Sequence, residues 1–136
     1  MYKRQDWLLV TGGGNDFAEC TCGVDCDDTL STLISEEGDG AIPELVQQAI
    51  SDGHQVAWAG YLTPMPSAES FSNCTGELEI LAGRMERYAD AVDQMVFVNG
   101  MEYGDGTNTE LYAEDGYHPS GEGSAVIGRA IAAAMQ

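Results

Sequence analysis

Short apolar runs alternate along the chain with stretches in which apolar residues recur every three or four positions. Residues 7–10, 55–61 and 95–98 form nearly continuous apolar runs, which are typical of strands covered on both faces. Helical spacing covers residues 27–34, 42–50, 76–92 and 125–135. Asp27 is a suitable cap for the first of these helices, and Gly53 follows the end of the second. The pattern therefore predicts strands that alternate with helices.

Strands and helices in alternation usually build a parallel sheet, because each helix returns the chain across the sheet in a right-handed crossover. The order of elements predicts an α/β fold, a three-layer α/β/α sandwich with about three visible parallel strands. Three strands are few for this architecture. Since the sequence has 136 residues, no internal repeat and no low-complexity linker, we expect residues 1–136 to form a single, partial domain.

The charge of the chain narrows the range of functions. Apolar residues make up 43% of the sequence, which is enough for a hydrophobic core. Five Lys and Arg residues against 23 Asp and Glu residues give a net charge of −18. Such a surface repels phosphate backbones and anionic headgroups, so the composition excludes nucleic-acid and membrane-surface functions. No apolar run approaches the roughly 20 residues of a membrane span.

Three of the four cysteines lie close together, and the fourth is distant: Cys20, Cys22, Cys26 and Cys74. Two disulfides are the favoured interpretation, with a four-thiolate zinc site or free thiols as alternatives. Cys20 and Cys22 are too close in sequence for ordinary disulfide geometry. We therefore expect Cys26 to pair within the cluster, and Cys74 to pair with whichever of Cys20 or Cys22 remains. Disulfides indicate an exported protein.

Two polar segments are expected at the carboxyl ends of strands, where open parallel sheets bind ligands. One is Gly13-Gly14-Asn15-Asp16, after the first strand, and the other is Asp115-Gly116-Tyr117-His118-Pro119, before the last helix. Asp115 can orient the His118 imidazole, as in a hydrolase triad, and Asn15 can donate to a developing oxyanion. The simpler interpretations are a glycine-rich turn and a turn that leads into a helix capped by Ser120.

Together the two segments resemble conserved blocks of the SGNH (GDSL-like) hydrolase family. The third block of that family, G-x-N-D, matches Gly13 to Asp16, and the fifth block, D-x-x-H-P, matches Asp115 to Pro119. The resemblance runs from Trp7 to the C-terminus, which is nearly the whole chain. It implies a flavodoxin-like SGNH hydrolase fold, and the cysteine-rich insert looks like that of exported bacterial members.

The resemblance also implies a role for individual residues. His118 would be the general base, Asp115 its orienting carboxylate, and Asn15 with Gly14 would lie in the oxyanion hole. The acyl group would be held as a serine ester, and neither a metal nor a cofactor is expected.

The family's first block, G-D-S, supplies the nucleophilic serine and has no match in this chain. Only twelve residues precede Gly13, and none of them is a serine. The nucleophile is therefore unknown, and the chain is similar to the carboxyl-terminal portion of an SGNH hydrolase. We expect residues 1–5 to mark a fragment boundary. The parent protein is expected to be secreted or periplasmic, with its signal peptide outside this chain.

These observations lead to two hypotheses about function. The first is an SGNH-type ester hydrolase acting on acyl or acetyl groups of a small ester, with weak or absent activity in this chain alone. Its nucleophile would be a serine from another segment or another chain, or a water activated by the histidine. The second is a non-catalytic remnant that associates with itself or with a partner. Calcium binding is disfavoured, because the acidic loops do not follow the spacing of a calcium loop.

The first strand predicts self-association. In the strand order 2-1-3-4-5 that the resemblance implies, a sheet without its first two strands would have Trp7 to Val10 at its edge. That segment is apolar and has neither a charge nor a proline, so it is poorly protected against pairing with another strand. We expect a homodimer in which the Trp7–Val10 strands meet across a two-fold axis.

Overall fold

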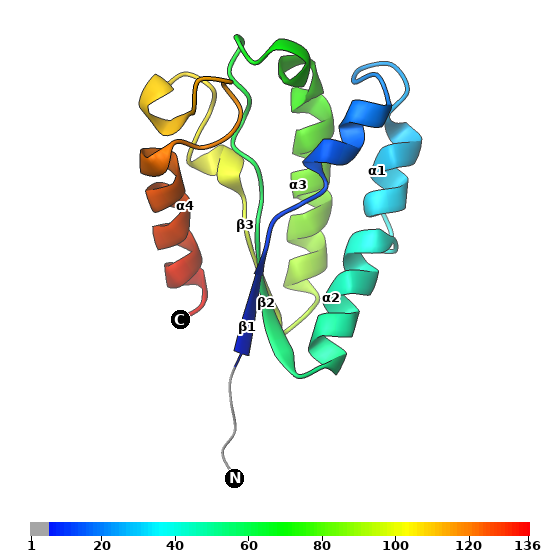
Figure 1. The fold of residues 1–136 in the computed structure, drawn as a ribbon. Coiled ribbons are helices and arrows are strands. Elements are labelled where there is room, and N and C mark those ends of the chain that lie inside the picture. The colour runs from blue at the N-terminus through cyan, green and yellow to red at the C-terminus, as the bar shows by residue number, and fades with distance from the viewer. Residues whose placement is uncertain (1–5) are drawn as a thin grey trace.

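A three-stranded parallel sheet lies at the centre of the structure, a computed structural model that describes residues 6–136 (Figure 1). Its strands are β1 (Asp6–Val10), β2 (His54–Ala59) and β3 (Met95–Val98), in the order β1-β2-β3. Both neighbouring pairs are parallel. The predicted α/β class with three parallel strands is confirmed. The boundary predicted at residues 1–5 lies outside the described residues.

Helices lie on both faces of the sheet (Figure 1). Helices α1 (Asp27–Leu33), α2 (Ala41–Ser51) and α3 (Thr75–Asp90) lie on one side. Helix α4 (Gly121–Ala134) is the only α-helix on the other side in the described part of the chain. This arrangement is consistent with a partial α/β/α sandwich. Within residues 6–136, no helix combines the length and the apolar character needed to cross a membrane.

The main core lies between the sheet and the α2–α3 side. In the sheet register Leu8, Val56 and Met95 are neighbours, so these side chains share one face. Val56 and Met95 are buried there in one cluster with residues of the helices, among them Val46 and Met85. Successive residues of a strand point to opposite faces, so Leu9 and Ala57 point toward the α4 side. Leu9 is 58% exposed, which shows that α4 leaves β1 uncovered.

One predicted helix cap and one predicted helix start differ from the structure. Asp27 is not a cap: Cys26 occupies the N-cap position of α1, and Asp27 lies in its first turn. Helix α4 begins at Gly121, four residues before the predicted start at residue 125. Its N-cap is Ser120, whose Oγ accepts a hydrogen bond from the Gly123 N–H at 3.1 Å. This cap compensates for the low helix propensity of glycine in the first turn.

Short 3-10 helices lie between the strands and the α-helices. They are η1 (Gly14–Glu19), η2 (Glu69–Cys74), η3 (Gly100–Glu102) and η4 (Thr109–Leu111). η1 follows β1, and η2 leads directly into α3. These segments surround the carboxyl edge of the sheet, where the candidate site lies.

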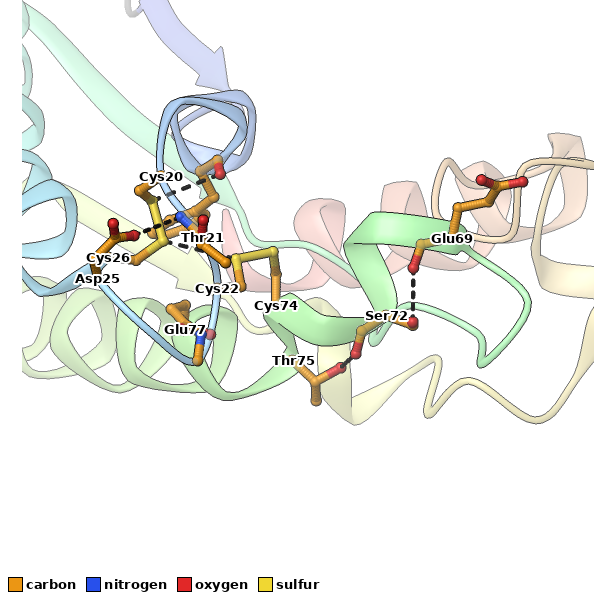
Figure 2. Close-up of a disulfide and its surroundings, with 12 residues drawn as sticks. Cys20, Thr21, Cys22, Asp25, Cys26, Glu69, Ser72, Cys74, Thr75 and Glu77 are labelled. Atoms are coloured by element: carbon orange, nitrogen blue, oxygen red, sulfur yellow. Dashed lines mark hydrogen bonds between the residues drawn. A yellow bond between two sulfur atoms is a disulfide. The ribbon is translucent and has the colours of Figure 1, made fainter.

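Two disulfides join the cysteines, as Figure 2 shows. Cys20 pairs with Cys26 inside the cluster, and Cys22 pairs with Cys74 at the start of α3. The predicted pairing is confirmed, with Cys22 as the partner of the distant cysteine. Both bonds fit an oxidising compartment.

Candidate active site at the carboxyl edge of the sheet

The structure brings the two predicted segments together at the carboxyl edge of the sheet. Asn15 lies in η1, directly after β1, and His118 lies in the loop between η4 and α4. Both residues line one cavity of about 300 Å³, although they are 103 positions apart in the sequence. The cavity also includes residues from the end of β2 and from the inner face of α4.

Asp115 and His118 form a hydrogen-bonded pair. The Oδ2 atom of Asp115 lies 2.5 Å from the Nδ1 atom of His118. The other carboxylate oxygen, Oδ1, accepts from the backbone N–H groups of Tyr117 at 3.1 Å and His118 at 3.0 Å. One oxygen therefore holds the turn, and the other holds the imidazole. The hydrogen bond between the two side chains does not involve the second ring nitrogen of His118, Nε2.

The hydrogen bond to His118, helped by the two backbone N–H groups, lowers the pKa of Asp115 from 3.8 to about 2. The carboxylate is therefore ionised throughout the neutral range. Because the pKa is lowered on folding, the stabilisation from this pair is present above pH 3.8 and is lost as the pH falls toward 2. The pair lies at the surface, with side-chain exposures of 62% for His118 and 38% for Asp115. Its value for stability is accordingly small.

The loop that carries the pair is tied to its surroundings by backbone hydrogen bonds. The Ala113 N–H donates to the His118 carbonyl at 2.8 Å, and the Met65 N–H donates to the Gly116 carbonyl at 2.8 Å. Gly116 has a φ of 80°, a left-handed conformation that favours glycine. Ser120, next to Pro119, is occupied as the cap of α4 and donates to the Glu110 carbonyl at 2.6 Å. The position of His118 is therefore set by the fold.

A ladder of rings supports the histidine from one side. The rings of Phe71 and Tyr117 are stacked with centroids 4.3 Å apart, and the Tyr117 and His118 rings have centroids 4.3 Å apart. Phe71 belongs to η2, the segment that ends at Cys74. The pattern of the sequence contains no sign of this contact, because Phe71 lies in a loop 46 positions before Tyr117.

Tyr61 holds the other half of the site, and the sequence did not indicate this role. Its hydroxyl accepts a hydrogen bond from the Gly14 N–H at 2.9 Å and is also hydrogen-bonded to the Thr11 side chain. Burial raises the pKa of Tyr61 above 10.0, so the hydroxyl stays protonated at neutral pH. A Cβ atom at Gly14 would lie 2.7 Å from the Tyr61 ring, which explains why glycine stands there. The Gly14 N–H is thus engaged by Tyr61, whereas Asn15 is exposed at the rim of the cavity.

Two further hydroxyl groups line the cavity, on Thr11 and Ser124. Ser124 lies on α4, one turn after its cap. No serine side chain that the structure describes hydrogen-bonds to the His118 ring. The described residues therefore contain a hydrogen-bonded aspartate and histidine, but no serine bonded to that histidine.

The metal-ligating groups of the described residues lie at the cysteines. The candidate clusters are Cys20, Asp25 and Cys26, and Cys22, Cys26 and Glu77. Each includes sulfur atoms that are joined in disulfides, which do not provide the thiolates that zinc requires. The zinc alternative is therefore wrong for this oxidised state.

Comparisons with family models, with curated proteins and with solved structures found no match to this chain. The functional interpretation accordingly rests on the residues and the geometry of the site.

Proposed function

We propose that this chain carries the base and oxyanion half of an SGNH-type ester hydrolase site. The observation that supports the proposal most is the 2.5 Å bond between Asp115 Oδ2 and His118 Nδ1, at the mouth of a cavity shared with Asn15. A surface aspartate and histidine held in this way have the arrangement of the lower half of a triad. The flavodoxin-like SGNH fold and the ester substrate belong to this proposal.

In the proposed reaction His118 Nε2 takes the proton of a nucleophilic hydroxyl as its oxygen attacks the ester carbonyl carbon. The nucleophile is a serine contributed from outside the described residues or, in the chain alone, a water. Asp115 stabilises the resulting imidazolium, and the Asn15 amide donates to the oxyanion. When the tetrahedral intermediate collapses, the bond to the leaving alcohol breaks and His118 returns the proton to it.

The test is hydrolysis of p-nitrophenyl acetate by the purified chain. We expect a slow reaction that falls by about 100-fold or more, to the buffer rate, in His118→Ala, because a positioned base contributes roughly that factor. The chain contains two histidines, and His54→Gln is the matched control because His54 begins β2, away from the carboxyl edge. An equal loss in both variants would contradict the proposal, and a wild-type rate equal to the buffer rate would favour the non-catalytic remnant. Labelling by a fluorophosphonate would identify an activated serine.

A second function, self-association, is favoured by the exposed edge of the sheet. β1 is an edge strand of the described sheet, and Leu8 and Leu9 on it are 36% and 58% exposed. Residues 7–10 have no charged side chain to discourage pairing. We propose that two copies pair through β1 about a two-fold axis, which would cover both strands at once.

Light scattering after size exclusion tests the dimer at moderate salt, where repulsion between chains of charge −18 is screened. The expected mass is about 29 kDa, twice the 14.5 kDa of one chain. Leu9→Lys should produce monomers, whereas Leu45→Lys, at a 48% exposed position on α2, should leave the dimer intact. A wild-type chain that is folded and monomeric would contradict the proposed dimer.

A further inference from the structure

The cavity at the candidate site is polar at one end only. Asn15 and His118 lie at the carboxyl edge of the sheet, whereas the wall beyond them is built from Ala59, Leu62 and the inner face of α4. Helix α4 starts beside the His118 loop and runs along the sheet toward its opposite edge (Figure 1). The cavity therefore leads from the base into an apolar space between α4 and the sheet.

The residues of α4 that line this space form one stripe at helical spacing: Ser124, Ile127, Gly128 and Ile131. The stripe is polar at Ser124, near the site, and apolar beyond it. A Cβ atom added at Gly128 would meet no heavy atom within 4 Å, so there is open space at this glycine. The hydroxyl of Tyr61, which also lines the cavity, is already hydrogen-bonded to the Gly14 N–H and to the Thr11 side chain.

We infer that this space is a binding pocket for the acyl chain of the substrate, and that it selects a chain of medium length. The inference rests on the proposed function for the direction of the ligand, with its carbonyl carbon near His118. A chain without polar groups fits the wall, because buried polar atoms would find no partners there.

The volume of the cavity limits the length of the acyl chain that it can hold. A cavity of about 150 Å³ admits benzene, and small-molecule sites begin at roughly 300 Å³. The cavity here, at about 300 Å³, thus holds roughly twice the volume of a benzene site. Acetyl would leave most of the space empty, and the long chains of membrane lipids would not fit in it. Chains of about six to ten carbons are expected to fill it.

Neutral alkan-2-ones test the pocket without any hydrolysis, because they present a carbonyl on an alkyl chain and contain no ester bond. Binding of 2-butanone, 2-hexanone, 2-octanone, 2-decanone and 2-tetradecanone is measured by calorimetry and by NMR shifts of the α4 isoleucines. We expect the affinity to rise by about fourfold per added methylene, the factor for burying such a group, and to level off near ten carbons. No rise with length, or a rise that continues to fourteen carbons, would overturn the inference.

Variants of residues on α4 test where the ligand binds. Gly128→Leu should weaken 2-octanone binding by about tenfold, because its side chain occupies the space. Gly128→Ala controls for the change in helix propensity, and Ala133→Leu, at an exposed position on the opposite face of α4, should bind as the wild type does. Ile131→Ala should enlarge the pocket, so the affinity for alkan-2-ones should level off at a longer chain length. Equal affinity in Gly128→Leu and Gly128→Ala would contradict the inference.

The outcomes for the pocket and for the proposed function are separable. Binding of alkan-2-ones that persists in His118→Ala while ester hydrolysis is lost supports both. Length-dependent binding without any hydrolysis supports the pocket alone. Hydrolysis of p-nitrophenyl acetate that depends on His118, combined with no binding of 2-octanone, overturns the pocket and leaves the proposed function standing.

Discussion

Replacing both Cys22 and Cys74 with alanine should lower the free energy of unfolding by about 4 kcal/mol. The two cysteines are 52 positions apart, and opening a loop of that length restores chain entropy worth about 4 kcal/mol to the unfolded state. A small domain has a total stability of only about 5–15 kcal/mol, so the variant should be marginally folded. Urea unfolding, followed by circular dichroism, measures the difference.

The Cys20–Cys26 bond supplies the matched control. It spans only six positions, and the same entropy model assigns it about 2 kcal/mol. Replacing Cys20 and Cys26 with alanine should therefore cost about half as much as opening the longer loop. Equal losses in the two variants would show that loop entropy is not the cause. Intact-mass measurement of the untreated chain should show four hydrogens fewer than the reduced chain.

The Cys22–Cys74 bond also connects the two halves of the site. Cys22 follows η1, which carries Asn15, and Cys74 ends η2, which carries Phe71. Phe71 stacks on Tyr117 beside His118. Reduction of this bond is thus expected to make the distance between Asn15 and His118 more variable.

Much of the fold could be predicted from the sequence, because the buried strands are short apolar runs between helical stretches. β3 was predicted with its observed bounds, since Met95 to Val98 has no competing interpretation. The start of α4 was missed, because the glycines at 121 and 123 have low helix propensity and conceal the first turn. In the structure the Ser120 cap and the close approach of Gly123 to the Leu111 carbonyl fix that turn.

The site could be predicted where its contacts are local or where the sheet topology places segments at one edge, as it does for Asn15 and His118. Asp115 and His118 are three positions apart, so a single turn brings them together. The spacing of the cysteines placed the partner of Cys26 within the cluster but left open whether Cys20 or Cys22 pairs with Cys74. Tyr61 contacts Gly14 across 47 positions, and no spacing rule indicates such a contact. The apolar pocket behind His118 also depends on where α4 settles against the sheet. Tertiary packing of this kind has no periodic signature in the sequence.

Asp115→Asn should abolish His118-dependent ester hydrolysis while leaving the fold intact. In the variant the amide oxygen replaces Oδ1 and accepts from the Tyr117 and His118 N–H groups. The amide NH₂ group then faces His118 Nδ1 in place of Oδ2, so Nδ1 must accept a hydrogen bond and the ring proton moves to Nε2. A protonated Nε2 cannot act as a base. Loss of the orienting carboxylate by this substitution costs a serine-protease triad on the order of 10⁴-fold in rate.

The rate of Asp115→Asn should therefore fall to that of His118→Ala, with an unchanged midpoint of urea unfolding. Because the pKa of Asp115 is about 2, its carboxylate is ionised across the whole assay range above pH 4, and the loss should not depend on its titration. Asp105→Asn is the matched control, since Asp105 Oδ1 accepts from the Thr107 N–H at 3.0 Å in a similar turn without a histidine. Nitrogen-15 NMR of the histidine rings reads the tautomer directly. A ring proton that stays on Nδ1, or hydrolysis at the wild-type rate, would show that Asp115 does not orient a base.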